Sequence, residues 1–565
     1  MARIRAIEIS NFRGIRHLAW HPSPGVNCLI GPGDSGKSTV LDAIDMCLGA
    51  RRSLPLTDAD FHGLDVAQPI VIMATLGDLD DPLRSMDSFG LYLRGFTDVI
   101  GVEDEPGKGC ETVLTVRFEV GADLEPVWSL YSERASAQGQ TRSLSWSDRV
   151  RLAPTRMGAG SDANLAWRRG SVLNRLTEEK ADASAALLRA ARDARARFGD
   201  ERVNQLADAL GIVDRTAAAL GIPVGGGSQA LLDAQSISFS GGTVSLHDDQ
   251  GVPLRALGTG STRLLVAGLQ REAASTASMV IIDELEHGLE PHRVIRLLGS
   301  LGAKEPVPPL QVFATTHSPV AVRELSGKQL FMVRRSSGHL TIRDIGDGGD
   351  AQGAARSFPE AFLAAKVIVC EGASEVGLLR GLDIHLAQNG QASLMAGGVA
   401  LVDAAGEKNL YKRANPFLAL GYRTLALRDD DVPPDQEGER QFLSSGGTLV
   451  HWRPGRALED ELFLSLSDGA AVLLLERAVE LLGDETVDAH IRSASGGKET
   501  LASCRSGLTP ERRACLGRAS RTKRAGWFKS VTWMQDAVVD IVAPDVGQVD
   551  PGFRALVSDV LAWAE

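Results

Sequence analysis

The sequence lacks the marks of a secreted or membrane-spanning protein. It contains six cysteines and no CxxC pair, which argues against a disulfide framework and a structural zinc site. No apolar run approaches the roughly 18 residues of a bilayer span. The N-terminal MARIRAIEISNFRG is charged from residue 3 and has no apolar core, unlike a signal peptide. We therefore expect a soluble, cytoplasmic protein with no membrane partner.

An excess of positive charge is also missing. The 565 residues include 60 Lys and Arg against 72 Asp and Glu, a formal net charge of −12 at pH 7. This balance argues against a generally basic nucleic-acid coat protein, although a local basic groove is compatible with it. With 44% hydrophobic residues the composition is ordinary for globular proteins, and the length predicts two or more domains.

Strand and helix patterns predict two α/β domains. Alternating apolar residues indicate strands in residues 1–30 and 66–150, and a strand–helix alternation follows over residues 260–316. Residues 176–221 are rich in Ala, Leu and Arg and predict a helical insertion within 160–225. We expect a Gly- and Asp-rich linker at 345–355 and a second, smaller parallel-sheet domain after it. The predicted domain ranges are 1–350 and 358–565.

A phosphate-binding loop follows the third predicted strand. Residues 31–38 fit G-x-x-x-x-G-K-[ST] in full, with an apolar strand before them and a helical pattern after them. The glycines allow backbone N–H groups to surround phosphate at a helix N-terminus. Lys37 then reaches the β- and γ-phosphates and the Ser38 hydroxyl binds Mg²⁺. The predicted ATP-binding residues are Gly31, Pro32, Gly33, Asp34, Ser35, Gly36, Lys37, Ser38, Thr39 and Asp283.

Two later strand ends complete the predicted ATPase site. The apolar strand at 279–282 ends in Asp283 and Glu284, where Asp283 can reach the Mg²⁺ shell and Glu284 can polarise the attacking water. A solvated acidic pair is the alternative. His317 follows the next strand, where it could sense the γ-phosphate or serve only as a structural histidine.

Carboxylates gather at strand ends in the second predicted domain. Glu371 ends the strand KVIVC, Glu375 lies on the first turn of the next helix, and Asp429 and Asp431 end the strand YRTLALR. Residues two apart in an extended chain point the same way, and parallel strands end at one edge of a sheet. Converging carboxylates repel each other without a divalent cation, and oxygen ligands favour Mg²⁺ or Mn²⁺. Phosphodiester cleavage is the natural use of such ions, whereas solvated acidic loops are the alternative.

Two further charged positions belong to this prediction. Glu459 lies in the acidic first turn of a predicted helix, either as a metal ligand or as a favourable partner of the helix dipole. Residues 505–529 contain eight Lys and Arg and a single acid, a candidate phosphate-backbone surface. At its end Lys529 could stabilise a charged transition state or simply be exposed beside packed aromatics. The predicted metal ligands are Ser38, Asp283, Glu371, Glu375, Asp429, Asp431 and Glu459.

The order of these motifs resembles a known family. The loop at 31–38, the acidic pair at 283–284 and His317 resemble ABC/SMC-like ATPases, while the carboxylates at 371, 375, 429 and 431 resemble a Toprim domain. Together they resemble the OLD (overcoming lysogenization defect) family of ATP-dependent nucleases, which includes the nuclease subunit of the Gabija anti-phage system. Residues 257–261 lack the usual LSGGQ-like signature wording, and the helical insertion is too short for an SMC arm.

The resemblance implies an α/β protein with an ABC-type ATPase domain, a helical dimerisation insertion and a C-terminal Toprim domain. It further implies binding of ATP and Mg²⁺ or Mn²⁺, assembly into a homodimer or higher oligomer, and cleavage or nicking of DNA in anti-phage defence. Catalysis is then expected to use Glu284 and His317 in the ATPase half and Glu371, Asp429, Asp431 and Lys529 in the Toprim half. Some family members act with a helicase or reverse-transcriptase partner.

Three functions stay open at this point. The first is an ATP-controlled DNA endonuclease or nickase. The second is an ATP-switched regulator that binds nucleic acid through an inert Toprim domain, and the third is a Toprim nuclease directed at RNA such as tRNA. A topoisomerase is disfavoured because that chemistry needs a tyrosine nucleophile, and the four tyrosines lie in no recognisable catalytic setting.

Overall fold

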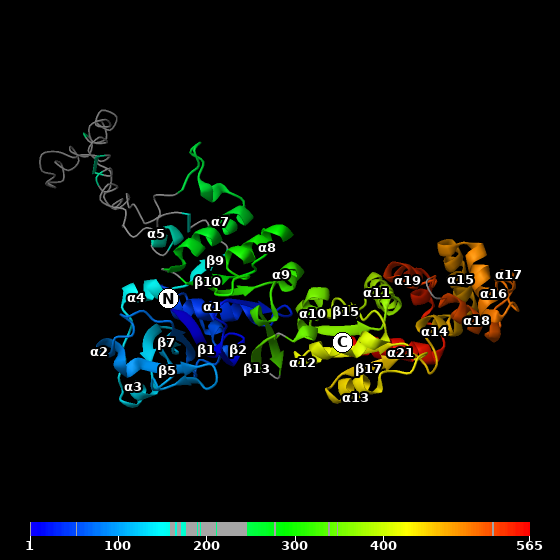
Figure 1. Ribbon diagram of the computed structural model, residues 1–565, viewed down its shortest axis with the longest axis horizontal. Coiled ribbons are helices and arrows are strands. Elements are labelled where there is room, and N and C mark those ends of the chain that lie inside the picture. The colour runs from blue at the N-terminus through cyan, green and yellow to red at the C-terminus, as the bar shows by residue number, and fades with distance from the viewer. Residues whose placement is uncertain are drawn as a thin grey trace. The chain divides into compact units, whose positions relative to one another are not determined.

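The computed structural model describes most of the chain outside the predicted helical insertion (Figure 1). The described residues are 2–51, 54–158, 164–165, 171–176, 189, 192–193, 211, 246–275, 278–336, 339–346, 348–522 and 525–565. The predicted insertion at 160–225 lies almost entirely outside them. Contacts divide the chain into two compact units, residues 1–27 with 38–314 and residues 28–37 with 315–565. No helix in the described ranges is both long enough and apolar enough to cross a bilayer.

The first unit contains an antiparallel sheet built from the strands predicted near the N-terminus. Its order is β2-β1-β4-β7-β5-β6, with β8 also paired to β7. Across it Ile9, Ile72 and Phe118 are register partners, and all three are fully buried. The strands are β1 (Arg3–Phe12), β2 (Ile15–Trp20), β4 (Ile70–Gly77), β5 (Leu93–Thr97), β6 (Gly101–Glu103), β7 (Glu111–Val120) and β8 (Pro126–Tyr131).

A second sheet carries the strands that precede the predicted ATPase motifs. Its order is β13-β12-β3-β11-β10-β9. The pairs β9–β10, β10–β11 and β12–β3 are parallel, and β13 is antiparallel to β12. Short, continuously buried strands are typical of a parallel sheet. The strands are β3 (Val26–Ile30), β9 (Thr155–Met157), β10 (Met279–Ile282), β11 (Gln311–Thr315), β12 (Leu330–Ser336) and β13 (His339–Asp344).

Helices follow the strands of this second sheet as the βαβ pattern predicts. Helix α1 starts at the phosphate-binding loop. Helix α8 starts with Pro291, and proline is favourable there because the first N–H of a helix has no partner within the helix. The helices up to this point are α1 (Lys37–Leu48), α2 (Met86–Phe89), α3 (Glu133–Ala137), α4 (Trp146–Leu152), α5 (Val172–Leu176), α7 (Thr259–Glu272), α8 (Pro291–Ser300) and α9 (Pro319–Glu324).

The stretch predicted as a linker contains a helix instead. Helix α10 (Gly349–Ser357) packs against α9 and α12 (Glu407–Ala419). The packing of its alanines explains the difference, because Ala354 and Ala355 are buried and tertiary packing overrides the low helix propensity of the neighbouring glycines. The prediction of a linker from the glycine-rich composition was therefore wrong for residues 349–355.

The second parallel sheet predicted from the sequence is present in the second unit. Its order is β15-β14-β16-β17, and every neighbouring pair is parallel. Cys370 is level with Asp403 of β15 and Leu427 of β16, so the carboxyl ends of three strands meet at one edge. The elements are β14 (Lys366–Cys370), α11 (Ala373–Gln388), β15 (Val399–Asp403), α12, β16 (Arg423–Arg428), α13 (Gln436–Ser444) and β17 (Thr448–His451).

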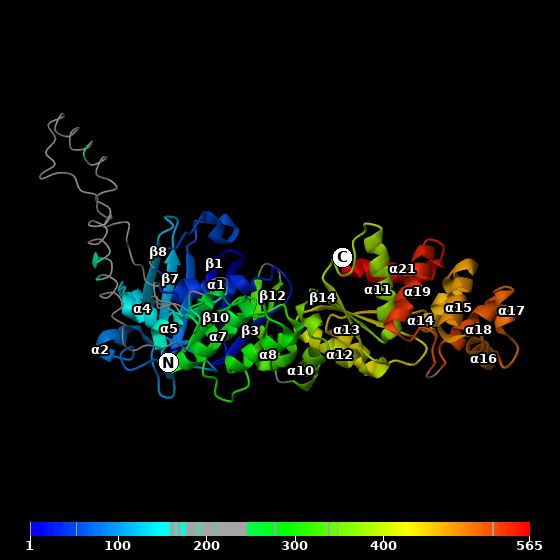
Figure 2. The same ribbon diagram turned by 90° about the horizontal axis from the view of Figure 1, so that it is seen from above.

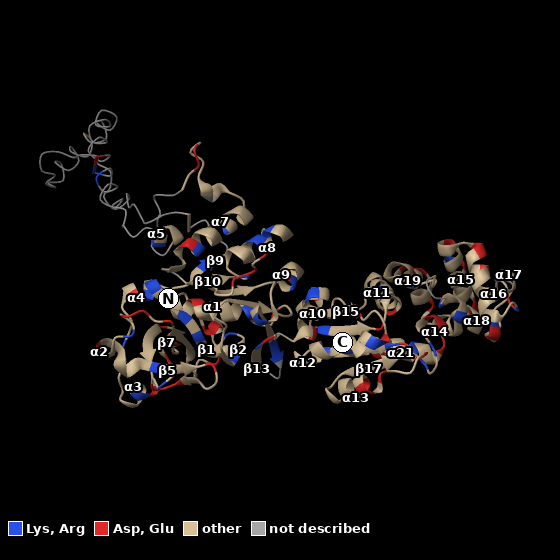
Figure 3. Cartoon of the chain, viewed as in Figure 1, with Lys and Arg blue, Asp and Glu red and all other residues tan. Residues whose placement is uncertain are grey.

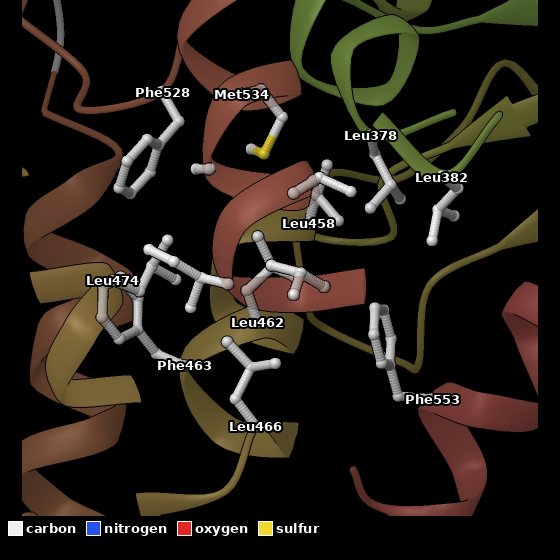
Figure 4. Packing of buried hydrophobic residues seen from close by; sticks show 14 of the residues in the cluster. Leu378, Leu382, Leu458, Leu462, Phe463, Leu466, Leu474, Phe528, Met534 and Phe553 are labelled. Atoms are coloured by element: carbon white, nitrogen blue, oxygen red, sulfur yellow. The ribbon is translucent and has the colours of Figure 1, made fainter. Parts of the chain in front are cut away.

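Helices fill the remainder of the second unit (Figure 2). They share one hydrophobic core with α11, in which Leu462 and Phe463 of α14 lie near Leu378 of α11, Met534 of α19 and Phe553 of α21 (Figure 4). This packing fixes α14 beside the sheet β15-β14-β16-β17. The helices are α14 (Leu458–Ser465), α15 (Asp468–Leu482), α16 (Asp484–Ser495), α17 (Leu501–Arg505), α18 (Pro510–Ser520), α19 (Val531–Ala537), α20 (Ala543–Asp545) and α21 (Pro551–Ala564).

Candidate nucleotide and carboxylate sites

The phosphate-binding loop connects β3 to α1 as predicted. Lys37 is almost fully buried, and its Nζ donates to the carbonyl oxygens of Gly31 at 3.0 Å and Pro32 at 2.7 Å. Gly31 has a φ of +134°, and a Cβ there would lie 2.6 Å from the Val333 carbonyl of β12. The first glycine of the motif is therefore required by both backbone conformation and space. Asp34 and Gly36 also have positive φ, which curls the loop before Thr39 continues α1.

The two residues predicted to hold the ATPase metal lie together. Ser38 Oγ donates to Asp283 Oδ1 at 3.1 Å, and Asp283 follows β10 directly. Glu284 has a φ of +48°, uncommon for a residue with a side chain. Arg263 of α7 donates to the Glu284 carbonyl at 2.7 Å and is itself buried, which lowers its pKa despite the neighbouring acids. Arg263 was not singled out in the sequence, since a backbone contact leaves no motif.

The remaining predicted ATPase positions lie after β11 and at the start of α7. His317 is exposed two residues after β11, so its role as a phosphate sensor stays a prediction. In the stretch at 257–261, Gly258 precedes α7 and Gly260 packs against the Gly288 carbonyl, where a Cβ would approach to 2.4 Å. This close contact joins the start of α7 to the segment after Glu284.

The carboxylates at two strand ends of the second unit converge. Glu371 follows β14 and Asp429 follows β16, and the Asp429 N–H donates to Glu371 Oε2 at 3.0 Å. Asp429 Oδ1 in turn accepts from the Leu458 N–H at 2.9 Å, at the first residue of α14. Glu371 and Asp429 therefore lie together at one edge of the sheet, as predicted from the ends of their strands. The start of α14 contacts the same carboxylate.

Two more acids and a lysine lie within this cluster. Lys529 Nζ lies 2.8 Å from Glu459 Oε1, and Ser374 Oγ lies 3.1 Å from the same oxygen. Glu375 Oε2 accepts from the Gly372 N–H at 3.0 Å. Glu375 and Glu459 are 2% and 0% exposed, and Glu375 Oε1 and Glu459 Oε2 have no hydrogen-bond partner among the described residues. Two buried carboxylate oxygens thus point to a missing positive charge or donor.

Burial and mutual repulsion shift the pKa values of these acids upward. Burial, then the charge of Glu459, raises the pKa of Glu375 to about 8. Burial also raises the pKa of Asp429 well above its usual value, with Glu375 and Glu459 adding to the effect. Burial lowers the pKa of Lys529, but the surrounding carboxylates outweigh this and raise it overall. Without a further cation, the cluster therefore favours protonated carboxyl groups.

The two aspartates after Asp429 lie in a bend and pair with different arginines. Asp430 Oδ1 lies 2.8 Å from Arg428 Nη1, whereas Asp431 forms an ion pair with Arg521. Arg521 Nη2 also lies 3.2 Å from Asp460 Oδ2 of α14. Neither Arg521 nor Asp460 was predicted as a site residue. Arg521 belongs to a distant helix end, and nothing in the sequence distinguishes Asp460 from the acids on either side of it.

The acidic cluster is compatible with divalent cations but does not form a finished metal site. Among the described residues, no three His, Cys, Asp or Glu side chains are arranged to hold a metal ion. The donor set consists of oxygens only, which suits Mg²⁺ or Mn²⁺. Glu375 Oε1 and Glu459 Oε2 are buried and have no donor among the described residues. A bound cation would therefore stabilise these carboxylates, which otherwise repel each other.

The basic segment at 505–529 is balanced by acids in space. Arg505 pairs with Glu476 and Asp484, Arg512 with Glu499, and Arg513 with Asp468. Figure 3 shows blue and red side by side over α15 to α18. The reversal of charge along the sequence therefore does not produce an unopposed basic surface in the part of this segment that the structure describes.

Comparisons with known proteins identify the families to which the two parts of the chain are similar. Residues 26–323, more than half of the chain, match the family model described as "AAA domain, putative AbiEii toxin, Type IV TA system". The chain belongs to this family. Residues 362–431 match "Overcoming lysogenization defect protein-like, TOPRIM domain", which spans the strands that carry Glu371, Asp429 and Asp431. The predicted order of an ABC/AAA-type ATPase followed by an OLD-like Toprim domain is confirmed, and so is the α/β fold class.

Similar individual proteins match only in part. "DNA replication and repair protein RecF" of Nitrosococcus oceani is 47% identical over 53 residues, and that of Chlorobium luteolum 44% over 45 residues. These matches cover 9% and 8% of this chain, which spans only 14% and 12% of the length of these relatives. Among solved structures, an Smc head bound to the C-terminal domain of ScpA from Pyrococcus furiosus aligns at 15% identity with a TM-score of 0.35, covering 61% of this chain and 96% of that one. The SMC head domain from Thermotoga maritima aligns at 15% identity with a TM-score of 0.28, covering 61% and 99%.

Proposed function

We propose that this protein is an ATP-binding and ATP-hydrolysing, divalent-metal-dependent DNA endonuclease or nickase of the OLD type, acting in anti-phage defence. The ATPase domain and the OLD-like Toprim domain support both halves of this proposal. The observation that carries the nuclease half is the buried cluster of Glu371, Glu375, Asp429 and Glu459, with two carboxylate oxygens that lack a partner. Assembly into a homodimer or higher oligomer, and any helicase or reverse-transcriptase partner, are further parts of the proposal.

In the ATPase half, each residue has a role that its position supports. The backbone of residues 31–36 and Lys37 bind the phosphates, and Ser38 with Asp283 would hold Mg²⁺. Glu284 would orient and polarise the attacking water, and Arg263 keeps its backbone in the strained conformation. His317 is our candidate for contact with the γ-phosphate.

In the Toprim half, Glu371, Glu375, Asp429, Asp431 and Glu459 would hold Mg²⁺ or Mn²⁺. A bound divalent cation supplies an activated water and stabilises the leaving oxygen of a phosphodiester. Lys529 places a positive charge beside these acids, 2.8 Å from Glu459, where it can oppose the charge that develops on the phosphate. Ser374 orients Glu459 through its hydroxyl.

A plasmid-nicking assay tests this function. Supercoiled DNA, linear DNA and tRNA are incubated with the protein in Mg²⁺, Mn²⁺ or EDTA, each with and without ATP. We expect metal-dependent nicking of DNA that Asp429→Asn and Glu371→Gln reduce by more than the roughly 10- to 100-fold loss caused by removing even an outer-shell metal partner. Asp430→Asn is the matched control, because Asp430 faces Arg428 and the Gly455 N–H, and it should keep its activity.

A second candidate is an ATP-switched nucleic-acid-binding regulator with an inert Toprim domain. The observation in its favour is that Lys529 and Arg521 already occupy the acids Glu459 and Asp431. This candidate predicts ATP hydrolysis with no cleavage of any substrate in any metal. Cleavage of tRNA alone in the same assay would instead identify an RNA-directed nuclease.

A further inference from the structure

The guanidinium of Arg521 bridges two acids from different elements. Arg521 follows α18, and its two Nη atoms pair with Asp431, beyond β16, and with Asp460 Oδ2 on α14 at 3.2 Å. The side chains of Arg521 and Asp431 are 27% and 26% exposed, and that of Asp460 is 9% exposed. Two-point pairing of this kind fixes a guanidinium in one orientation.

The surroundings hold this bridge at the rim of the carboxylate cluster. Asp460 Oδ2 accepts from the Ala457 N–H at 3.1 Å, and α18 packs so closely on Asp460 that a Cβ on Gly517 would lie 2.5 Å from its Oδ1. Asp431 is two residues from Asp429, whose N–H binds Glu371. Arg521 is therefore anchored by Asp460 while it pairs with Asp431, one of the proposed metal ligands.

Acidic side chains outnumber the basic side chains that pair with them in this region. Six carboxylates meet in this region, and only Lys529 and Arg521 of the described residues pair with them. The acids are Glu371, Glu375, Asp429, Asp431, Glu459 and Asp460. Both cations come from one short stretch of chain, residues 521–529. Glu375 Oε1 and Glu459 Oε2 have no hydrogen-bond donor among the described residues, so the two cations do not reach every carboxyl group of the cluster.

We propose that Arg521 is a built-in competitor of the divalent cation in the Toprim domain. In the metal-free protein it occupies Asp431, and a cation completes its oxygen ligand set only when Arg521 releases that carboxylate and remains paired with Asp460. The inference rests on the proposed metal-dependent function. Arg521 thus makes the affinity for the divalent cation lower than the carboxylates alone would give.

Metal titration of the full-length protein tests this competition. Binding of Mn²⁺ is measured by calorimetry for the unmodified protein, for Arg521→Gln and for Arg518→Gln, without nucleotide or DNA. Arg518 is exposed on α18, and its replacement removes the same charge. We expect Arg521→Gln to bind Mn²⁺ roughly two- to fivefold more tightly, the contribution of one partly exposed charge pair, and Arg518→Gln to bind as the unmodified protein does. Equal affinities in the two variants would overturn the inference.

Thermal unfolding gives a second readout that does not depend on activity. In EDTA, Arg521→Gln should melt at a lower temperature because Asp431 and Asp460 lose their counter-charge. Added Mn²⁺ should raise its melting temperature more than that of the unmodified protein, by mass action on the folded state. If Arg521→Gln does not fold, Arg521→Lys keeps the charge but loses the two-point pairing and should show the same change more weakly. No difference in Mn²⁺ response between Arg521→Lys and the unmodified protein would then overturn the proposal.

Failure of this inference and failure of the proposed function give different results. Tighter Mn²⁺ binding by Arg521→Gln without cleavage of any substrate supports the competition and rejects the nuclease. Metal-dependent cleavage with unchanged Mn²⁺ affinity in Arg521→Gln supports the nuclease and rejects the competition.

Discussion

At the scale of single residues, the buried pair of Glu375 and Glu459 is the least ordinary feature of the molecule. Buried charges are costly unless they are paired, and a buried carboxyl group without a positive partner avoids the cost by taking up a proton. Among the described residues, Lys529 forms an ion pair with Glu459 and not with Glu375, so Glu375 depends on a proton or on a further cation. The pH dependence of stability should report this state.

Replacement of Glu375 by glutamine should change how stability depends on pH. Its folded-state pKa of about 8, against an ordinary value of 4.5, means that the folded protein holds a proton that the unfolded chain has lost. The free energy of unfolding therefore falls as pH rises from about 4.5 to about 8. In EDTA, Glu375→Gln should make the melting temperature less sensitive to pH across this range and higher than that of the unmodified protein at pH 8.

The control for this prediction is an exposed glutamate of the same unit. Glu437 is 81% exposed at its side chain, and Glu437→Gln should keep the pH dependence of the unmodified protein. Identical melting profiles for Glu375→Gln and the unmodified protein would show that Glu375 is ionised in the folded state.

The sequence predicted most residues of this cluster, but it predicted their contacts only at the strand ends. Glu371 and Asp429 end parallel strands, so the order of the strands brings them together. The pairing of Lys529 with Glu459, and of Arg521 with Asp431, joins segments far apart in the chain and follows from helix packing that no spacing reveals. For the same reason the basic composition of residues 505–529 does not form the predicted basic surface in the part that the structure describes, because the acids that pair with it come from other parts of the chain.

At the scale of elements, the start of α7 depends on close backbone contact. Gly260 lies in the first turn of α7, and a Cβ there would meet the Gly288 carbonyl at 2.4 Å. Gly288 has a φ of +73° and follows the acidic pair after β10. The helix therefore needs glycine at a position where glycine otherwise disfavours a helix.

Two glycine-to-alanine changes in α7 should have opposite effects. Gly260→Ala cannot avoid the Gly288 carbonyl without moving backbone, so it should lower the melting temperature and weaken ATP hydrolysis, because Arg263 on the same helix holds Glu284. Gly268→Ala has nothing within 4 Å of its new Cβ and should stabilise the protein by about 0.5–1 kcal/mol, the usual preference of a helix for alanine. Equal melting temperatures for the two variants would contradict the contact.

The elements themselves were largely predictable, because most of them are marked by strong periodicity. The strands that flank the phosphate-binding loop and the carboxylates were all identified from apolar runs that end in glycine or acid. Helix α10 was not, since its glycines obscured a buried alanine face. The dense helical packing of residues 458–564 around α14 also escaped prediction, because it rests on contacts among helices rather than on any one of them.

At the scale of the whole molecule, the phosphate-binding loop and the carboxylate cluster belong to the same compact unit. Residues 28–37 are grouped with 315–565. Strand β3 pairs with β12, Gly31 lies against the Val333 carbonyl, and the next residue, Arg334, stacks on Tyr422 at 3.5 Å from the ring centroid. Tyr422 precedes β16, the strand that ends at Asp429, and its hydroxyl donates to the Phe362 carbonyl at 2.7 Å. A continuous set of contacts thus connects the loop to β16 within this unit.

The two proposed activities use different residues, so single substitutions should separate them. Glu284→Gln keeps Lys37, Ser38 and Asp283, so it should bind ATP normally, while loss of the group that polarises water should slow hydrolysis by about 100-fold or more. Asp429→Asn changes only the carboxylate cluster and should hydrolyse ATP at the rate of the unmodified protein while it loses metal-dependent cleavage of DNA. Glu290→Gln, at an exposed acid just before α8, is the control for the first change and should hydrolyse ATP normally. ATP binding, phosphate release and plasmid nicking are measured on each variant, and loss of ATP hydrolysis in Asp429→Asn would show that the two sites form one catalytic unit.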